Sequence, residues 1–129
     1  MIILIDSDVL IHYLRGKIVA RELFERHCDE MAFSVVTVGE IWAGVKGERE
    51  AELVSSLFSV FPVLPVTGDI AKKAGLYVAR YGRSHGVVLP DALIAATAWH
   101  EKCTLMTLNV RHYPMFPGLE AAWRVEGEE

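Results

Sequence analysis

The sequence predicts an α/β protein, with a single three-layer α/β/α domain built on a mostly parallel sheet of about five strands. Short apolar runs alternate along the chain with longer segments of helical spacing, as in successive βαβ units. The first run, residues 2–5, holds four consecutive large aliphatic side chains. Such a run is typical of a strand that is buried on both faces of a parallel sheet. We therefore expect helices to cover both faces.

The first half of the chain predicts two strands and four helices. Helical spacing begins at Asp8, and Gly16 is a natural stop for that first helix. In the next helix Ala20, Leu23 and Phe24 share one face, which marks its buried side. Short apolar runs mark the strands. In order, we expect helices at residues 8–14 and 18–27, a strand at 31–35, and helices at 37–45 and 48–59.

The second half continues the alternation. A third strand at residues 61–66 contains two prolines, which favour the edge of a sheet. Thr67 is a plausible N-cap for the following helix, which we expect to close at Gly82. An alanine-rich stretch then predicts a strong helix. In order, we expect a loop at 84–90, a helix at 91–100, a strand at 104–107, a loop at 109–114 and a last strand at 121–125.

Composition narrows the class of protein. The chain has 129 residues, of which 52% are hydrophobic, so we expect one compact domain spanning residues 1–129. No run is long enough to span a bilayer and no basic leader precedes the first strand, so we expect a cytoplasmic protein. Cys28 and Cys103 are too few for a disulfide framework or a structural zinc site. The net charge of −4 decides little, because metal bound to carboxylates reverses the local sign.

Four oxygen-bearing side chains stand where function is expected. Asp6 ends the first buried strand, and ligands of open α/β sheets bind at the carboxyl ends of strands. Glu40 lies on a helical face with small and apolar neighbours, and Asp91 projects from a helix N-terminus. Asn109 follows the fourth strand. Because clustered carboxylates repel one another, a shared divalent cation is the ordinary solution, and oxygen-only ligands favour Mg²⁺ or Mn²⁺. Such a site suits phosphoryl chemistry.

Each acid also has a purely structural interpretation. Thr37 and Glu40 match a capping box, in which the glutamate only satisfies a backbone N–H. Asp91 is also explained by the favourable dipole at a helix start. We assign Asp8 to the start of the first helix. Ser7 and Thr107 either orient groups near the site or simply cap and pack.

The motifs together resemble the PIN-domain family, and within it the VapC-type ribonuclease toxins. The resemblance covers nearly the whole chain and rests on residues 5–10, 34–40, 89–98 and 107–113. It implies a PIN-like nuclease domain in which Asp6, Glu40 and Asp91 form an acidic triad that holds Mg²⁺ or Mn²⁺. Asn109 stands where members carry Asp or Asn. The implied activity is metal-dependent endonucleolytic cleavage of RNA.

The resemblance also implies partners. It predicts a homodimer and a cognate VapB-like antitoxin that covers the site. By analogy Arg111, His112 and Arg83, with His85, are candidates to bind RNA phosphates, although solvated loop residues explain them equally well. Antitoxin binding needs exposed apolar surface, for which Trp42 and Phe58 are candidates. Core packing is the alternative for Phe58.

Two rival functions remain open. An Asp6-Ser7-Asp8 sequence after a hydrophobic strand also begins haloacid-dehalogenase-like phosphatases, in which the first aspartate is the nucleophile. That chemistry lacks a convincing downstream lysine here and leaves Glu40 without a role. The second rival is a catalytically inert PIN-like interaction module, against which the presence of all three acids counts.

Overall fold

Four parallel strands form the centre of the molecule. The structure is a computed structural model, and it describes residues 1–123. The strand order is β3-β2-β1-β4, with β1 at Ile3–Ile5, β2 at Met31–Ser34, β3 at Val63–Leu64 and β4 at Thr104–Met106. Every pairing is parallel, and Leu4 of β1 stands opposite Ala32 on one side and Leu105 on the other. The expected parallel α/β class is confirmed.

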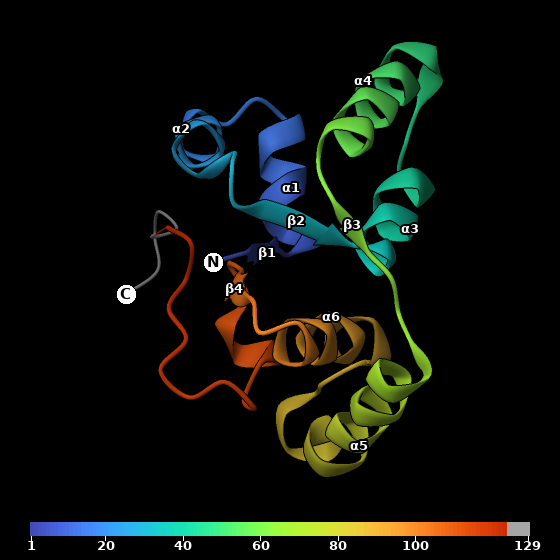
Figure 1. Cartoon of the computed structure of the whole chain (residues 1–129), viewed down its shortest axis with the longest axis vertical. Coiled ribbons are helices and arrows are strands. Elements are labelled where there is room, and N and C mark those ends of the chain that lie inside the picture. Colours follow the sequence, from blue (N-terminus) through green and yellow to red (C-terminus); the bar gives the residue numbers. More distant parts are fainter. Residues whose placement is uncertain (124–129) are drawn as a thin grey trace.

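Helices connect the strands and cover both faces of the sheet. Figure 1 shows α1, α2 and α4 on one side and α5 and α6 on the other. A short 3₁₀ helix, η1, follows β4 at Val110–His112. The α-helices are α1 (Ser7–Leu14), α2 (Ile18–His27), α3 (Val35–Ala43), α4 (Gly47–Val60), α5 (Gly68–His85) and α6 (Leu89–His100).

Alternate residues of β1 supply the two faces. Ile3 and Ile5 belong to a core that includes residues of α1, α2 and β2, whereas Leu4 packs with Ile94 and Ala95 of α6. This period of two is the geometry of an extended strand. A third cluster, between α5 and α6, contains Ile70, Ala74, Val87, Ala92 and Ala96. The predicted burial of the first strand on both faces is confirmed.

The strand order creates one reversal. The chain moves outward from β1 to β2 to β3, and it then returns through α5 and α6 to place β4 on the other side of β1. In open parallel sheets, ligands bind at the carboxyl ends of the two strands where the order reverses. Those strands here are β1 and β4, and Asp6 directly follows the first of them.

Several predicted boundaries were wrong by a few residues. α3 begins at Val35 because Ser34, and not Thr37, is its N-cap. α5 continues through Gly82 to His85, since an interior glycine weakens a helix by only about 1 kcal/mol without ending it. β3 shortens to two residues, but its position at the sheet edge agrees with its flanking prolines.

The expected fifth strand at 121–125 is not seen in the part that the structure describes. Over residues 121–123, one backbone hydrogen bond joins the segment to the end of β4, from Ala122 N–H to Thr107 O at 2.8 Å. One bond does not make a strand ladder. Residues 124 and 125 lie outside the described residues. Among the helices of residues 1–123, none combines the length and apolarity needed to cross a bilayer.

Gly86 ends α5 in the left-handed conformation, with φ +65°, and its N–H donates to Gly82 O. A side chain is disfavoured at positive φ, so Gly86→Ala is expected to lower the free energy of unfolding by about 1–2 kcal/mol. Gly75 lies in the middle of the same helix, and a Cβ there meets nothing within 4 Å. Gly75→Ala is therefore the matched control and should stabilise by about 0.5–1 kcal/mol. Urea unfolding of both variants tests whether position 86 needs a glycine. Equal changes in the free energy of unfolding would contradict this requirement.

Candidate active site

Asp6 is the best-buried acid of the candidate site. It is the N-cap of α1, and Ser7 N–H donates to its Oδ1 at 2.7 Å. Its own backbone N–H donates to Met106 O of β4 at 2.9 Å. The residue is only 5% exposed. Pairing of β1 with β4 therefore fixes the backbone of Asp6, and the start of α1 holds its carboxylate.

The second oxygen of Asp6 accepts two hydroxyl groups. Thr107 Oγ1 and Tyr113 Oη donate to Oδ2 at 2.8 Å and 2.7 Å. Burial raises the pKa of the Asp6 carboxyl, the bonds from Tyr113, Thr107 and Ser7 oppose that rise, and the charge of Asp91 adds to it. The pKa is raised on balance. The negative form of Asp6 is thus stabilised too little by its neighbours alone.

Glu40 joins the same site from α3. Ser7 Oγ donates to its Oε1 at 2.7 Å and also forms a 3.0 Å hydrogen bond with Thr37 Oγ1. Partial burial is the main cause that raises the pKa of Glu40, and the charges of Asp6 and Asp91 raise it further. The capping-box interpretation is wrong, because Glu40 lies in the second turn of a helix that begins at Val35. Its carboxylate contacts a side chain of α1 instead.

Asp91 lies in the first turn of α6, after Pro90 at the helix start. Its Oδ2 is 2.9 Å from His112 Nδ1 of η1, and the same nitrogen is 2.9 Å from Asn109 Nδ2. Since a ring nitrogen either donates or accepts, His112 Nδ1 serves one of these partners at a time. The loop after β4 is therefore held against the start of α6 by polar contacts.

The three predicted acids come from three elements and act on one another. The charge of Asp91 raises the pKa of both Asp6 and Glu40, and Asp6 raises that of Glu40. Within residues 1–123, however, no three His, Cys, Asp or Glu side chains form a ready-made metal cage. Mg²⁺ is commonly bound by one or two carboxylates and keeps several waters, so an open oxygen site of this kind fits it.

A family model fits this arrangement. The model of the PIN domain matches residues 3–114, which include every acid described above. The chain belongs to the PIN-domain family.

Within this family, the chain is similar in sequence to two named ribonucleases. It is 44% identical to ribonuclease VapC10 of Mycobacterium tuberculosis over 97% of this chain and 96% of the relative. It is 40% identical to ribonuclease VapC19 of the same organism, over 91% and 96%. Among solved structures, the DNA-bound VapBC of Salmonella typhimurium superposes with a TM-score of 0.78 at 25% identity, covering 94% of this chain and 96% of that one.

Sequence reasoning missed two side chains that contact the candidate site. Asp8 was assigned only to the start of α1, but its Oδ2 accepts from Leu108 N–H at 3.0 Å and lies 3.3 Å from Thr107 Oγ1. Burial, followed by the charge of Asp6, raises its pKa to about 6. The two-residue spacing from Asp6 was the available signal. The sequence around Tyr113 carried no such signal, because it does not show that the tyrosine hydroxyl contacts Asp6, which precedes it by about a hundred residues.

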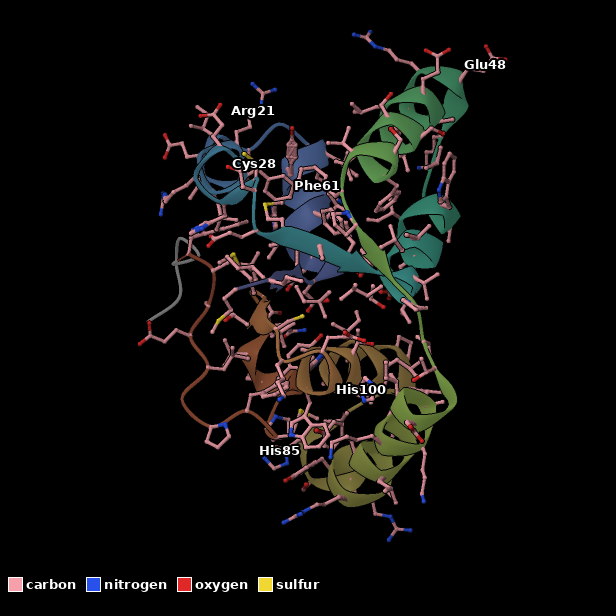
Figure 2. The ribbon with its side chains drawn as sticks, viewed as in Figure 1. Arg21, Cys28, Glu48, Phe61, His85 and His100 are labelled. Carbon is pink, nitrogen blue, oxygen red and sulfur yellow. The ribbon has the colours of Figure 1, made fainter. Side chains whose placement is uncertain are left out.

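Of the basic residues predicted to bind RNA, His112 alone contacts a site acid among the described residues. Arg83, His85 and Arg111 are exposed. In the part of the chain described here, no hydrogen bond or ion pair joins them to a site carboxylate. His85, labelled in Figure 2, ends α5 and bonds its neighbour Ser84. Their predicted role toward RNA stays a prediction.

Asp8→Asn is expected to stabilise the metal-free PIN chain at neutral pH. The Asp8 carboxyl has an ordinary pKa of 3.8 and a pKa of about 6 in the folded protein. Because the unfolded chain gives up this proton more readily, the native state loses stability as the pH rises from about 4 to about 6. Removing the charge should add about 1–3 kcal/mol at pH 7.5 and little at pH 4. Leu108 N–H retains an acceptor in the amide oxygen.

Urea unfolding in EDTA at the two pH values measures the Asp8→Asn effect. Asp29→Asn, at an exposed position, is the matched control and should change stability little at either pH. A gain of equal size at both pH values would show that the charge of Asp8 is not the cause.

Proposed function

We propose that this chain is a metal-dependent endoribonuclease, the toxin of a VapBC-like toxin–antitoxin pair, with residues 1–129 forming one PIN-like domain. The observation that carries the proposal is the set of mutually repelling carboxylates of Asp6, Glu40 and Asp91 beside the carboxyl ends of β1 and β4. The relatives named ribonuclease VapC support the reaction and its RNA substrate.

Asp6, Asp91 and Glu40 are the proposed ligands of Mg²⁺ or Mn²⁺. When bound, the metal supplies an activated water and neutralises charge on the scissile phosphate. The chain's residues hold the carboxylates in place: Thr107 and Tyr113 orient Asp6, and Ser7 orients Glu40. Asn109, exposed beside His112, completes the proposed catalytic set as a neutral oxygen or N–H donor. A bound cation would let the site accept an anionic substrate despite its acids.

Arg111, His112 and Arg83 are proposed to contact RNA phosphates. Arg111 and His112 belong to η1, which also carries the contact to Asp91, so a phosphate at the acids would lie near this segment. Phosphate contacts position a nucleic acid without reading its sequence. These residues therefore support binding and not choice of the cleavage site.

A VapB-like antitoxin is the proposed protein partner. An apolar groove of about 420 Å³ lies between the end of α1 and α4, lined by residues that include Tyr13, Leu53 and Leu57. Trp42 is 39% exposed on α3 and remains a candidate contact. Phe58 packs edge-to-face on Phe33 at 5.6 Å, which supports core packing for it. A solved toxin–antitoxin complex from Klebsiella pneumoniae, which superposes on this chain with a TM-score of 0.77 at 25% identity, supports a partner of this kind.

A homodimer belongs to the same proposal. Leu76 of α5 and Trp99 of α6 expose more than half of their surface, and the Lys73 ammonium lies 3.6 Å from the Trp99 ring centroid. Apolar side chains of this size on the α5–α6 layer suit contact with a second copy.

Asp6→Asn and Asp91→Asn are each expected to lower the rate of RNA cleavage in Mn²⁺ by about 100-fold or more, because altering even an outer partner of a metal ligand lowers activity 10–100-fold. Cleavage of a mixed RNA substrate, followed on a denaturing gel, measures the effect. Asp69→Asn, in the first turn of α5, is the matched control and should cleave normally.

The same assay separates the rival functions. An aspartyl-phosphate on Asp6 would favour the phosphatase, although the PIN match leaves that reading without family support. Wild-type protein that binds metal but cleaves no RNA would favour the inert module. Robust RNA cleavage by a variant that combines Asp6→Asn and Asp91→Asn would contradict the proposed site.

Added Mg²⁺ or Mn²⁺ is expected to raise the melting temperature, because a cation stabilises the charged forms of Asp6 and Glu40, whose pKa values are raised by burial and, to a smaller extent, by neighbouring acids. At a hundredfold excess over Kd the gain is about 2.7 kcal/mol. It should shrink at acid pH, where the ligands hold protons, and in Asp91→Asn. Thermal melts with metal and with EDTA measure it, and equal melting temperatures in both would contradict metal binding.

A further inference from the structure

Within residues 1–123, the hydrogen bonds on Asp6 leave it one free acceptor position. A carboxylate offers about four lone-pair sites, two on each oxygen. Oδ2 accepts two hydroxyl groups, from Thr107 and Tyr113, and Oδ1 accepts one N–H, from Ser7. The remaining site is therefore on Oδ1.

Packing holds the Tyr113 hydroxyl in place. The residue is 1% exposed, and its ring belongs to the core with Leu4, Ile94 and Leu105. Its backbone N–H donates to Val110 O, and its carbonyl accepts from Phe116 N–H, both at 3.0 Å. Because ring and backbone are both fixed, an ion approaching Oδ2 cannot simply displace this hydroxyl.

We infer that Tyr113 is a positioning residue that restricts Asp6 to coordination through one oxygen, and that this restriction makes the site discriminate against Ca²⁺. The inference rests on the proposed metal site. It adds a selectivity that neither the acids nor the family match assigns.

The chemistry of the ions gives the direction. Ca²⁺ takes six to eight oxygen ligands at 2.3–2.6 Å and often binds a carboxylate through both oxygens. Mg²⁺ takes six at about 2.0–2.1 Å, keeps several waters and needs only one oxygen from each carboxylate. Mn²⁺ shares octahedral oxygen sites with Mg²⁺. Occupying Oδ2 with two hydroxyls thus removes a ligand that Ca²⁺ uses and leaves the smaller ions unaffected.

A purely structural role for Tyr113 makes a different prediction. A buried phenol needs a hydrogen-bond acceptor, and Asp6 provides one. If that were its whole purpose, removing the hydroxyl would change stability and would leave the relative affinities of the ions unchanged. The ratio of Mn²⁺ to Ca²⁺ affinity therefore separates the two roles.

Tyr113→Phe is the test variant, because it removes the hydroxyl and keeps the packed ring. Binding of Mn²⁺, followed by its electron paramagnetic resonance signal and competed with Ca²⁺, gives the affinity ratio without any nuclease assay. Wild type should prefer Mn²⁺, and the variant should narrow that preference by about 10-fold. Tyr81→Phe is the matched control, since Tyr81 lies on α5 and packs against the cluster between α5 and α6, and its ratio should equal that of wild type.

Thr107→Val provides a second route if Tyr113→Phe melts below the assay temperature. It vacates the other acceptor position of Oδ2 and should shift the ratio in the same direction. An unchanged ratio in a folded variant overturns the inference while leaving the nuclease proposal intact. Wild-type protein that binds neither ion overturns both, and nuclease activity in Mn²⁺ with an unchanged ratio overturns only the selectivity.

Discussion

The pairing of β1 with β4 is the constraint on which the candidate site depends. Asp6 N–H donates to Met106 O, and this bond brings the end of β1 beside Thr107 and the loop that carries Tyr113. Both strands have only three residues, so few contacts fix their register. Because side chains alternate between the two faces of a strand, a slip of one residue would point Asp6 to the opposite face. Leu4 and Leu105, packed with α6, oppose that slip. The apolar core therefore fixes the register that the polar site needs.

Burial and, to a smaller extent, mutual repulsion disfavour the charged carboxylates of the site, and their hydrogen bonds offset this only in part. Asp6, Asp8 and Glu40 all have raised pKa values, with burial as the largest cause and neighbouring acids as a further one. A structural cluster of carboxylates would be expected to include basic partners. Among the described residues, no ion pair reaches Asp6, Asp8 or Glu40, and the histidine that contacts a site acid is His112, at Asp91. An environment that disfavours its own charges is well suited to a bound cation.

The acids of the candidate site are carried by different helices around the sheet. One face of the sheet carries α1, α2 and α4, and Ser7 of α1 is hydrogen-bonded to Glu40 of α3. The other face carries α5 and α6, with Asp91 at the start of α6. Glu40 and Asp91 thus reach the site from two different helices, α3 and α6. Changes in the packing of either helix would alter their separation, whereas Asp6 stays fixed to the sheet.

The sequence by itself determined the α/β class, the parallel sheet, the order of the elements and the family, because buried runs, helical spacing and the residues around Asp6, Glu40 and Asp91 are local patterns. It also singled out the strand end at Asp6. Only the tertiary structure decided that Glu40 is no capping residue, that Asp8 contacts Leu108 and that Tyr113 donates to Asp6. Those contacts join residues far apart in the chain, and their existence depends on strand register and helix packing, which no local pattern encodes.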